Sequence, residues 1–263
     1  MQHKFSRTAL LIGTEGLTKL HNSKVAVFGI GGVGSYTVEA LVRAGVGSLL
    51  LVDFDEICLT NVNRQLHALH STVGEYKVDV MKKRALDINP QVKVDTLKEF
   101  YNGKNSYMIT EDLDYVVDAI DTVSGKVGLI KASKEKAIPV VSAMGAGNQL
   151  DPTGYVIVDI SETKVCPLAR EVRKKLRREA IYEGVKVVYN PAPPLKPKQE
   201  EVQDCKENCI CPSGDAHCSL RNTIPGSISF VPPVVGLYLA SVVVNELLGE
   251  LSRHANGRDD FFA

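Results

Sequence analysis

The sequence predicts an α/β fold: a Rossmann-like, doubly wound and mostly parallel sheet with added C-terminal strands and a C-terminal core helix. Between residues 24 and 143, short apolar runs alternate with segments of helical length, as expected for strands joined by crossover helices. A glycine-rich turn, GIGGVG at 29–34, joins the first apolar run to a helix. The 263 residues, 44% apolar and 24% charged, are enough to bury such a core.

The N-terminal part predicts a short helix before the first strand. Residues 5–21 have a helical pattern that Gly13 and Gly16 interrupt. The apolar run VAVF is then typical of a buried strand that feeds the glycine turn. We expect, in order, a strand at 25–28, a helix that continues to Arg43 and a strand at 48–53.

The alternation continues to residue 143. Pro90 closes a helix whose apolar residues share one face, and DYVVDA and IPVVSA are typical of buried strands. The predicted elements are a helix at 74–89, strands at 92–97 and 114–119, a helix at 122–136 and a strand at 138–143.

The pattern changes after residue 143. Strands are expected at 155–160 and 185–189, on either side of a helix at 167–180; they extend the sheet, and antiparallel members are allowed. The stretch 190–222 is rich in Pro, Lys, Glu and Cys and is too long for a plain connector. We expect a mobile loop there.

The charge-free run 223–245 raises the alternative of a membrane span. Pro225, Pro232 and Pro233 leave only about 15 residues of uninterrupted helix from Val234, whereas a bilayer needs about 20. We therefore expect a buried core helix and a protein that is not membrane-embedded. No secretory signal is apparent in MQHKFSRTALLIG, so a cytoplasmic location is the expectation.

The glycine turn predicts a nucleotide site. Gly29, Gly31, Gly32 and Gly34 follow a strand and open a helix, whose free N–H groups and dipole suit an anion. Asp53 ends the next strand, about 20 residues on, where a carboxylate would hold a ribose hydroxyl. The motif by itself leaves NAD and ATP open, and a ligand-free glycine turn is the alternative.

Polar residues after the second and fourth strands favour a triphosphate. Arg64 and Lys77 would neutralise a departing pyrophosphate, and Asp121 would hold the Mg²⁺ that bridges the phosphates. Asn61 would bond a phosphate or ribose oxygen. Taken singly, the two cations could belong to a solvated face and Asp121 could be a helix N-cap. An NAD-linked oxidoreductase would leave all three charges unexplained.

The order and spacing of five motifs resemble those of the adenylating domain of the ubiquitin-activating-enzyme-like superfamily. The motifs are GIGGVGS, LVDFD, TNVNRQ, Lys77 and DAID. The resemblance implies that Asp53 binds the ATP ribose, that Asn61, Arg64 and Lys77 bind the phosphates and that Asp121 lies by the metal. It also implies that the N-terminal arginine reaches the ATP of the partner subunit in a homodimer. The matching residue is Arg7, and Asp55 of LVDFD is a further cofactor-binding candidate.

Four cysteines lie within 14 residues of the predicted loop, without the paired CxxC motifs that hold structural zinc in the adenylyltransferases of sulfur-carrier proteins. Metal binding, a transient disulfide and incidental thiols all stay open for them. They are Cys205, Cys209, Cys211 and Cys218.

A basic helix is the distinctive feature of the extension. In REVRKKLRR, six of nine residues are basic, in a chain of zero formal net charge. A basic stripe on one helix side suits a phosphate backbone, and a solvated face is the alternative. The tRNA-binding candidates are Arg170, Arg173, Lys174, Arg177 and Arg178.

Together with TNVNRQLHAL, SAMGAGNQLDPT and PLAREVRKKLRR, the whole chain resembles the tRNA threonylcarbamoyladenosine dehydratase family (TcdA/CsdL type). This implies ATP-dependent adenylation of the threonyl carboxylate in tRNA, followed by ring closure within the nucleoside and release of AMP and pyrophosphate. Some family members carry a cysteine before the last helix, but residues 222–227 hold none. Whether Cys218 replaces it, and whether a sulfur-relay protein is a partner, stays open.

The sequence therefore predicts a single adenylating domain over residues 1–263. Its nucleotide-binding core would span 24–143 and its tRNA-side extension 144–263. ATP and Mg²⁺ are the expected cofactors. The alternative activity is adenylation of the C-terminal glycine of a ubiquitin-like sulfur-carrier protein.

Overall fold

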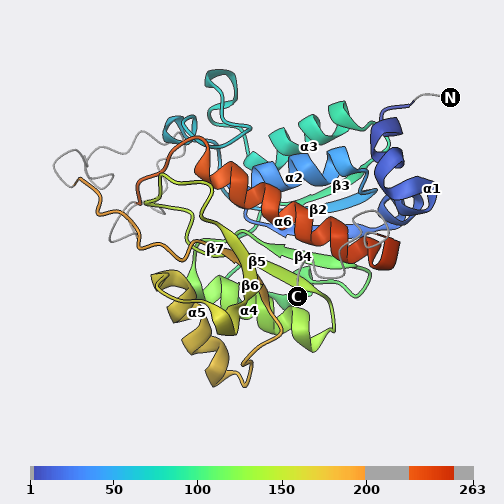
Figure 1. The fold of residues 1–263 in the computed structure, drawn as a ribbon. Coiled ribbons are helices and arrows are strands. Elements are labelled where there is room, and N and C mark those ends of the chain that lie inside the picture. The colour runs from blue at the N-terminus through green and yellow to red at the C-terminus, as the bar shows by residue number, and fades with distance from the viewer. Residues whose placement is uncertain (1–2, 199–224, 252–263) are drawn as a thin grey trace.

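A computed structural model describes residues 3–198 and 225–251. Its sheet has seven strands in the order β3-β2-β1-β4-β5-β7-β6 (Figure 1). The strands are β1 (Lys24–Phe28), β2 (Ser48–Val52), β3 (Lys93–Leu97), β4 (Tyr115–Asp118), β5 (Val140–Ala143), β6 (Val156–Asp159) and β7 (Lys186–Tyr189). The helices are α1 (Ser6–Asn22), α2 (Gly34–Ala44), α3 (Lys77–Ile88), α4 (Val123–Glu135), α5 (Pro167–Arg178) and α6 (Val231–Leu248).

Every neighbouring pair of strands runs parallel except β6 and β7, which are antiparallel. Strand β1 lies between β2 and β4, with Val25 opposite Leu49 on one side and Tyr115 on the other. The chain thus moves outward from β1 in one direction and returns to its other side with β4. Ligands of open α/β sheets bind at such a reversal, outside the carboxyl ends of the strands.

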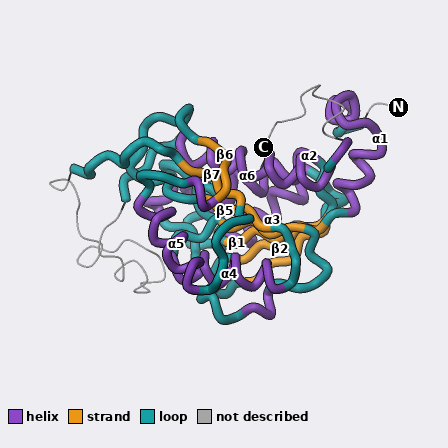
Figure 2. Tube along the Cα trace, turned by 60° about the horizontal axis from the view of Figure 1, so that its bottom comes forward, coloured by secondary structure: helices purple, strands orange, loops and turns teal. Residues whose placement is uncertain are grey.

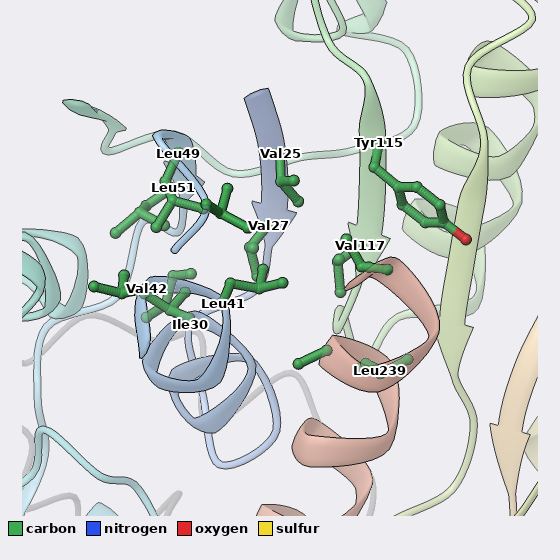
Figure 3. Close-up of a cluster of buried hydrophobic side chains, with 14 of the residues drawn as sticks. Val25, Val27, Ile30, Leu41, Val42, Leu49, Leu51, Tyr115, Val117 and Leu239 are labelled. Carbon is green, nitrogen blue, oxygen red and sulfur yellow. The ribbon is translucent and has the colours of Figure 1, made fainter. Parts of the chain in front are cut away.

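Helices cover both faces of the sheet, as Figure 2 shows. α2, α3 and α6 lie on one face, and α4 and α5 lie on the other (Figure 1). Alternate residues of β1 serve the two cores: Val25 and Val27 belong to the first, and Ala26 and Phe28 to the second. Figure 3 shows the first core between the strands and the helices. The predicted doubly wound, mostly parallel α/β sheet is confirmed.

The last helix begins earlier than the sequence predicts. α6 starts at Val231, because Pro232 and Pro233 lie in its first turn, where a helix does not need their N–H groups. Its 18 residues are long and apolar enough for a membrane span by length and composition alone. It packs closely, however: a Cβ at Gly236 would lie 2.4 Å from the carbonyl oxygen of Val33 at the start of α2. The helix is the C-terminal core helix that the sequence predicts.

One further expectation needs adjustment, and another lies mostly outside the described residues. α1 bends at Gly13 (φ 69°, ψ 178°) but runs through Gly16, which is buried against Ile12 and Leu248. The described start of the predicted mobile loop, residues 190–198, contains neither helix nor strand. The remainder, with all four clustered cysteines, lies outside the described residues.

Candidate active site

The glycine turn lies at the reversal of the sheet, between the carboxyl ends of β1 and β4. Gly29 has φ +88°, and a Cβ there would lie 2.6 Å from the Ala119 carbonyl oxygen. A Cβ at Gly34 would lie 1.8 Å from the Gly29 carbonyl oxygen. These two glycines are required by the turn and by its packing against the end of β4.

The two middle glycines differ from the outer ones. A Cβ at Gly32 would lie 3.1 Å from Pro232, so α6 closes one side of the turn. A Cβ at Gly31 would have one described atom within 4 Å, the Gln65 amide nitrogen at 3.8 Å. The missing side chain at Gly31 therefore leaves open space beside the backbone, which suits close approach of a phosphate.

Asp53 holds the turn from the end of β2. Its Oδ2 accepts a hydrogen bond from the Ile30 N–H at 2.6 Å, and its Oδ1 accepts one from the Asp55 N–H at 2.9 Å. Burial raises the pKa of this carboxyl group, while the positive charge of Lys77 opposes the shift. Because a carboxylate offers about four lone-pair positions, Asp53 can still accept hydrogen bonds from the hydroxyl groups of a ribose.

Lys77 is a buried cation at the first position of α3. Its side chain is 6% exposed, and its Nζ bonds Asp55 Oδ2 at 2.5 Å. Burial alone would lower the pKa of Lys77, but the charges of Asp53 and Asp55 outweigh that effect and raise it. The positive charge of Arg64 acts against this rise, which places the two cations in one electrostatic field. The lysine is charged and held in place before any ligand arrives.

The loop after β2 carries the other two phosphate candidates. Asn61 ends the short helix η1 (Leu59–Asn61), where its Oδ1 accepts a hydrogen bond from the Cys58 N–H at 3.1 Å. Arg64 Nη1 donates to the Thr60 carbonyl and to Asn63 Oδ1, both at 2.9 Å. The loop thus orients its guanidinium group through its own residues.

Asp121 lies at the carboxyl ends of the strands, whereas Arg7 belongs to α1, which approaches their amino ends. Asp121 is exposed, three residues past the end of β4, and the N-cap of α4 is Thr122, so the N-cap alternative for Asp121 is wrong. Arg7 is exposed on α1. Phe5, which lies just before α1, approaches Gly45 at the C-terminal end of α2, whereas the glycine turn lies at the N-terminal end of that helix. An 11-residue helix is roughly 16 Å long, so the structure does not bring Arg7 to the site of its own chain.

The basic helix is α5, and its buried face is Ala169, Val172 and Leu176. The candidates point outward except for Arg173, which is half-buried and donates from Nη1 to the carbonyl and hydroxyl oxygens of Thr163. Arg173 therefore anchors the helix to the segment after β6. The exposed members of the set are Arg170, Lys174, Arg177 and Arg178.

Two buried residues beside the turn were missed by the sequence reasoning. His67 is 2% exposed, and its Nε2 lies 2.6 Å from the Ile30 carbonyl oxygen. Gln65 is 7% exposed, and its Oε1 has no hydrogen-bond partner among the described residues. Both belong to TNVNRQLHAL, but a polar loop has no periodicity that distinguishes inward from outward side chains.

A second buried polar cluster was also missed. Lys126 Nζ lies 3.2 Å from each carboxylate oxygen of Asp118, and Ser142 Oγ donates to Asp118 Oδ2 at 2.5 Å. A sequence signal did exist, because Lys126 shares the helix face of the apolar Leu129 and Ile130.

The chain is similar to known proteins over almost its whole length. The ThiF family model matches residues 5–261. The tRNA threonylcarbamoyladenosine dehydratase of Bacillus subtilis is 46% identical over 252 residues, 95% of this chain and 97% of that protein. The protein of the same name from Haemophilus influenzae is 34% identical over 95% of each chain. The crystal structure of Escherichia coli TcdA, a tRNA N6-threonylcarbamoyladenosine dehydratase in complex with ATP, superposes with a TM-score of 0.80 at 32% identity, covering 95% of this chain and 96% of that one. The chain therefore belongs to the ThiF family and, within it, to the tRNA threonylcarbamoyladenosine dehydratases.

Proposed function

We propose that this protein is an ATP-dependent enzyme that dehydrates threonylcarbamoyladenosine in tRNA to its cyclic form. The observation that carries the proposal is the meeting of an open glycine turn, Asp53 and the buried cation of Lys77 at one edge of the sheet. The relatives that cover nearly the whole chain bear the name of this activity, and one of them was solved with ATP.

The reaction begins with a carboxylate, which is ionised near neutral pH and needs no general base. One oxygen of the threonyl carboxylate attacks the α-phosphorus of ATP, and the bond to pyrophosphate breaks. A nucleophile of the same nucleoside then attacks the acyl carbon, and AMP leaves with the carboxylate oxygen. Because this ring closure is intramolecular, positioning supplies much of its acceleration.

In this proposal the charged side chains stabilise the departing pyrophosphate. Lys77 and Arg64 neutralise the charge that develops there, and Lys77 is suited to this because its position is set in advance by Asp55. Asp53 accepts a ribose hydroxyl, and Asn61 bonds a phosphate or ribose oxygen. Open space beside Gly31 admits the phosphates.

Asp121 fits the role of a Mg²⁺ ligand. Mg²⁺ is usually held by one or two carboxylates together with substrate phosphates. The described residues contain no cluster of three or more His, Cys, Asp or Glu side chains, so the ion would need the phosphates to complete its coordination. When bound, it withdraws negative charge from the phosphates. Asp121 is exposed and lies just past β4, at the reversal of the sheet.

The remaining parts of the proposal concern partners. The exposed cations of α5 would contact the tRNA backbone, and residues 144–263 would form the tRNA side of the single domain. Arg7 would complete the site of a second copy, which makes the enzyme a homodimer. A cytoplasmic location, where tRNA is used, belongs to the same proposal.

The rival activity is adenylation of the C-terminal glycine of a ubiquitin-like sulfur-carrier protein. It would use the same ATP site and differ only in the carboxylate presented to it. The deciding experiment follows pyrophosphate release with ATP and Mg²⁺ in the presence of tRNA carrying threonylcarbamoyladenosine, unmodified tRNA or a carrier protein. We expect release only with the modified tRNA. Release that requires the carrier and ignores the tRNA would overturn the proposed substrate while leaving the adenylation site intact.

A further inference from the structure

The centre of the glycine turn is held by two side chains rather than by backbone partners. The Ile30 N–H donates to Asp53 Oδ2, and the Ile30 carbonyl oxygen lies 2.6 Å from His67 Nε2. The Ile30 side chain is fully buried and packs in the core beside Leu41 and Val42 (Figure 3). Both polar groups and the side chain of this residue are therefore anchored.

The hydrogen bond from His67 has a defined direction. A carbonyl oxygen can only accept, so the proton resides on Nε2 of a neutral ring. Burial lowers the pKa of His67 to about 4, so the ring is neutral at physiological pH. Its Nδ1 has no hydrogen-bond partner among the described residues. The backbone of His67 is held in turn, because its carbonyl oxygen accepts a hydrogen bond from Thr72 Oγ1 at 2.7 Å.

The geometry of one peptide group connects this bond to the ligand. In a trans peptide, the Ile30 carbonyl and the Gly31 N–H point in opposite directions. The carbonyl points inward to His67, so the N–H points away from the protein interior, on the residue where a Cβ would meet open space. Among the described residues, no hydrogen bond from this N–H is present. Within the described part of the chain this N–H is therefore an unused donor beside the open space at Gly31.

We propose that His67 is a positioning residue for ATP: by donating to the Ile30 carbonyl it turns the Ile30–Gly31 peptide so that the Gly31 N–H faces the phosphates. The inference rests on the proposed ATP site. His67 also lies in the same loop as Arg64, so its hydrogen bond helps to hold this loop against the turn, together with the bond from the Leu66 N–H to Ser35 Oγ. Without it the peptide can rotate and present its carbonyl oxygen to the phosphates.

Three variants test this role. His67→Gln keeps a donor at the position of Nε2, His67→Leu removes it, and His70→Leu is the matched control, because His70 is exposed in the same loop. ATP affinity is measured directly by calorimetry without tRNA, and KM values for ATP and for modified tRNA are then determined. We expect about a tenfold weaker ATP affinity for His67→Leu, roughly the value of one hydrogen bond, with the KM for tRNA within about twofold. His67→Gln should remain within about threefold of the wild type, and His70→Leu should match it.

The role is refuted if folded His67→Leu binds ATP as the wild type does, or if His67→Gln loses as much affinity as His67→Leu. Thermal melting establishes that each variant is folded. Should His67→Leu not fold, His67→Asn takes its place, because its shorter amide cannot reach Ile30, and the same tenfold criterion applies. Since the affinity measurement contains no tRNA, a wrong substrate assignment leaves this test valid. Absence of ATP binding in the wild type would instead contradict the proposed function.

Discussion

Two buried lysines each bond an aspartate at the carboxyl ends of the strands, and the two pairs differ in how far they are closed to solvent. Lys77 bonds Asp55, whose side chain is 38% exposed. Lys126 bonds Asp118, and these side chains are 1% and 0% exposed. Asp118 also accepts hydrogen bonds from Ser142 Oγ and from the Ile120 N–H, so nothing of this second pair faces solvent.

The difference separates a closed, structural pair from one that is open to solvent and belongs to the proposed ATP site. A fully buried ion pair contributes little beyond the cost of its own desolvation, but it strongly penalises the loss of either partner. Lys126 therefore joins α4 to β4 and β5 without being available to a ligand. In the Lys77 pair the carboxylate of Asp55 can return to water, which leaves a desolvated cation for an incoming polyanion. The exposure of Asp55 to solvent would allow Lys77 to exchange this carboxylate for a phosphate.

The largest expected effect tests the closed pair. Lys126→Met leaves Asp118 buried without a counter-charge and should lower the free energy of unfolding by about 3–5 kcal/mol, measured by urea denaturation. The control is Lys131→Met on the same helix, whose partially exposed bond to Glu179 should be worth less than about 1 kcal/mol. A loss below about 1 kcal/mol for Lys126→Met would contradict the distinction between the closed Lys126–Asp118 pair and the open Lys77–Asp55 pair.

The open pair should respond in activity rather than in stability. Lys77→Met removes the cation that we propose stabilises pyrophosphate and should lower the rate of pyrophosphate release by about 100-fold or more. Its unfolding free energy should fall less than that of Lys126→Met, because Asp55 can be hydrated and the buried Asp53 keeps its hydrogen bonds from the Ile30 and Asp55 N–H groups. Lys83→Met is the control, since this exposed lysine of α3 bonds the surface residue Glu75. Activity of Lys77→Met within about tenfold of the wild type would exclude the lysine from the site.

The pH dependence of stability tests whether the open site carries a buried neutral histidine. The pKa of His67 is lowered from 6.5 to about 4, so the unfolded chain binds the extra proton first as the pH falls. Stability should therefore be unaffected above about pH 6.5 and should decrease between about pH 6.5 and 4, by about 1–3 kcal/mol. Denaturation of the wild type and of His67→Gln over this range isolates the effect, which the variant should lack. Parallel curves would show that His67 titrates normally.

The smallest effect concerns the surface away from both pairs. Replacing Arg177 and Arg178 by Ser should weaken tRNA binding a few-fold and reduce the slope of log affinity against log salt by about 1.5–2, if each contacts one phosphate. ATP affinity should not change. A double Ser variant of Lys82 and Lys83 on α3 removes the same charge from another helix and serves as the control. Equal salt slopes for the two double variants would assign α5 to an ordinary solvated face.

Much of the site could be predicted because its signals are local. The glycines, Asp53 and Lys77 follow strands or begin helices, and such positions are recognised from short-range patterns. Their meeting at one edge follows from the rule that the carboxyl ends of parallel strands share an edge of the sheet. Burial of Lys77 was not predictable in this way, since it depends on how α3 packs.

The sequence by itself thus determined the fold class and the order of the elements, and it predicted the chemistry of the candidate site. Tertiary structure alone decided which polar groups face inward. Ile30 and His67 are 37 residues apart, and Asp118 and Ser142 are 24 apart. It also turned Arg173 from a surface candidate into an anchor on Thr163. Local patterns report periodicity and turn chemistry, whereas the partner of a buried polar group is set by packing between distant segments.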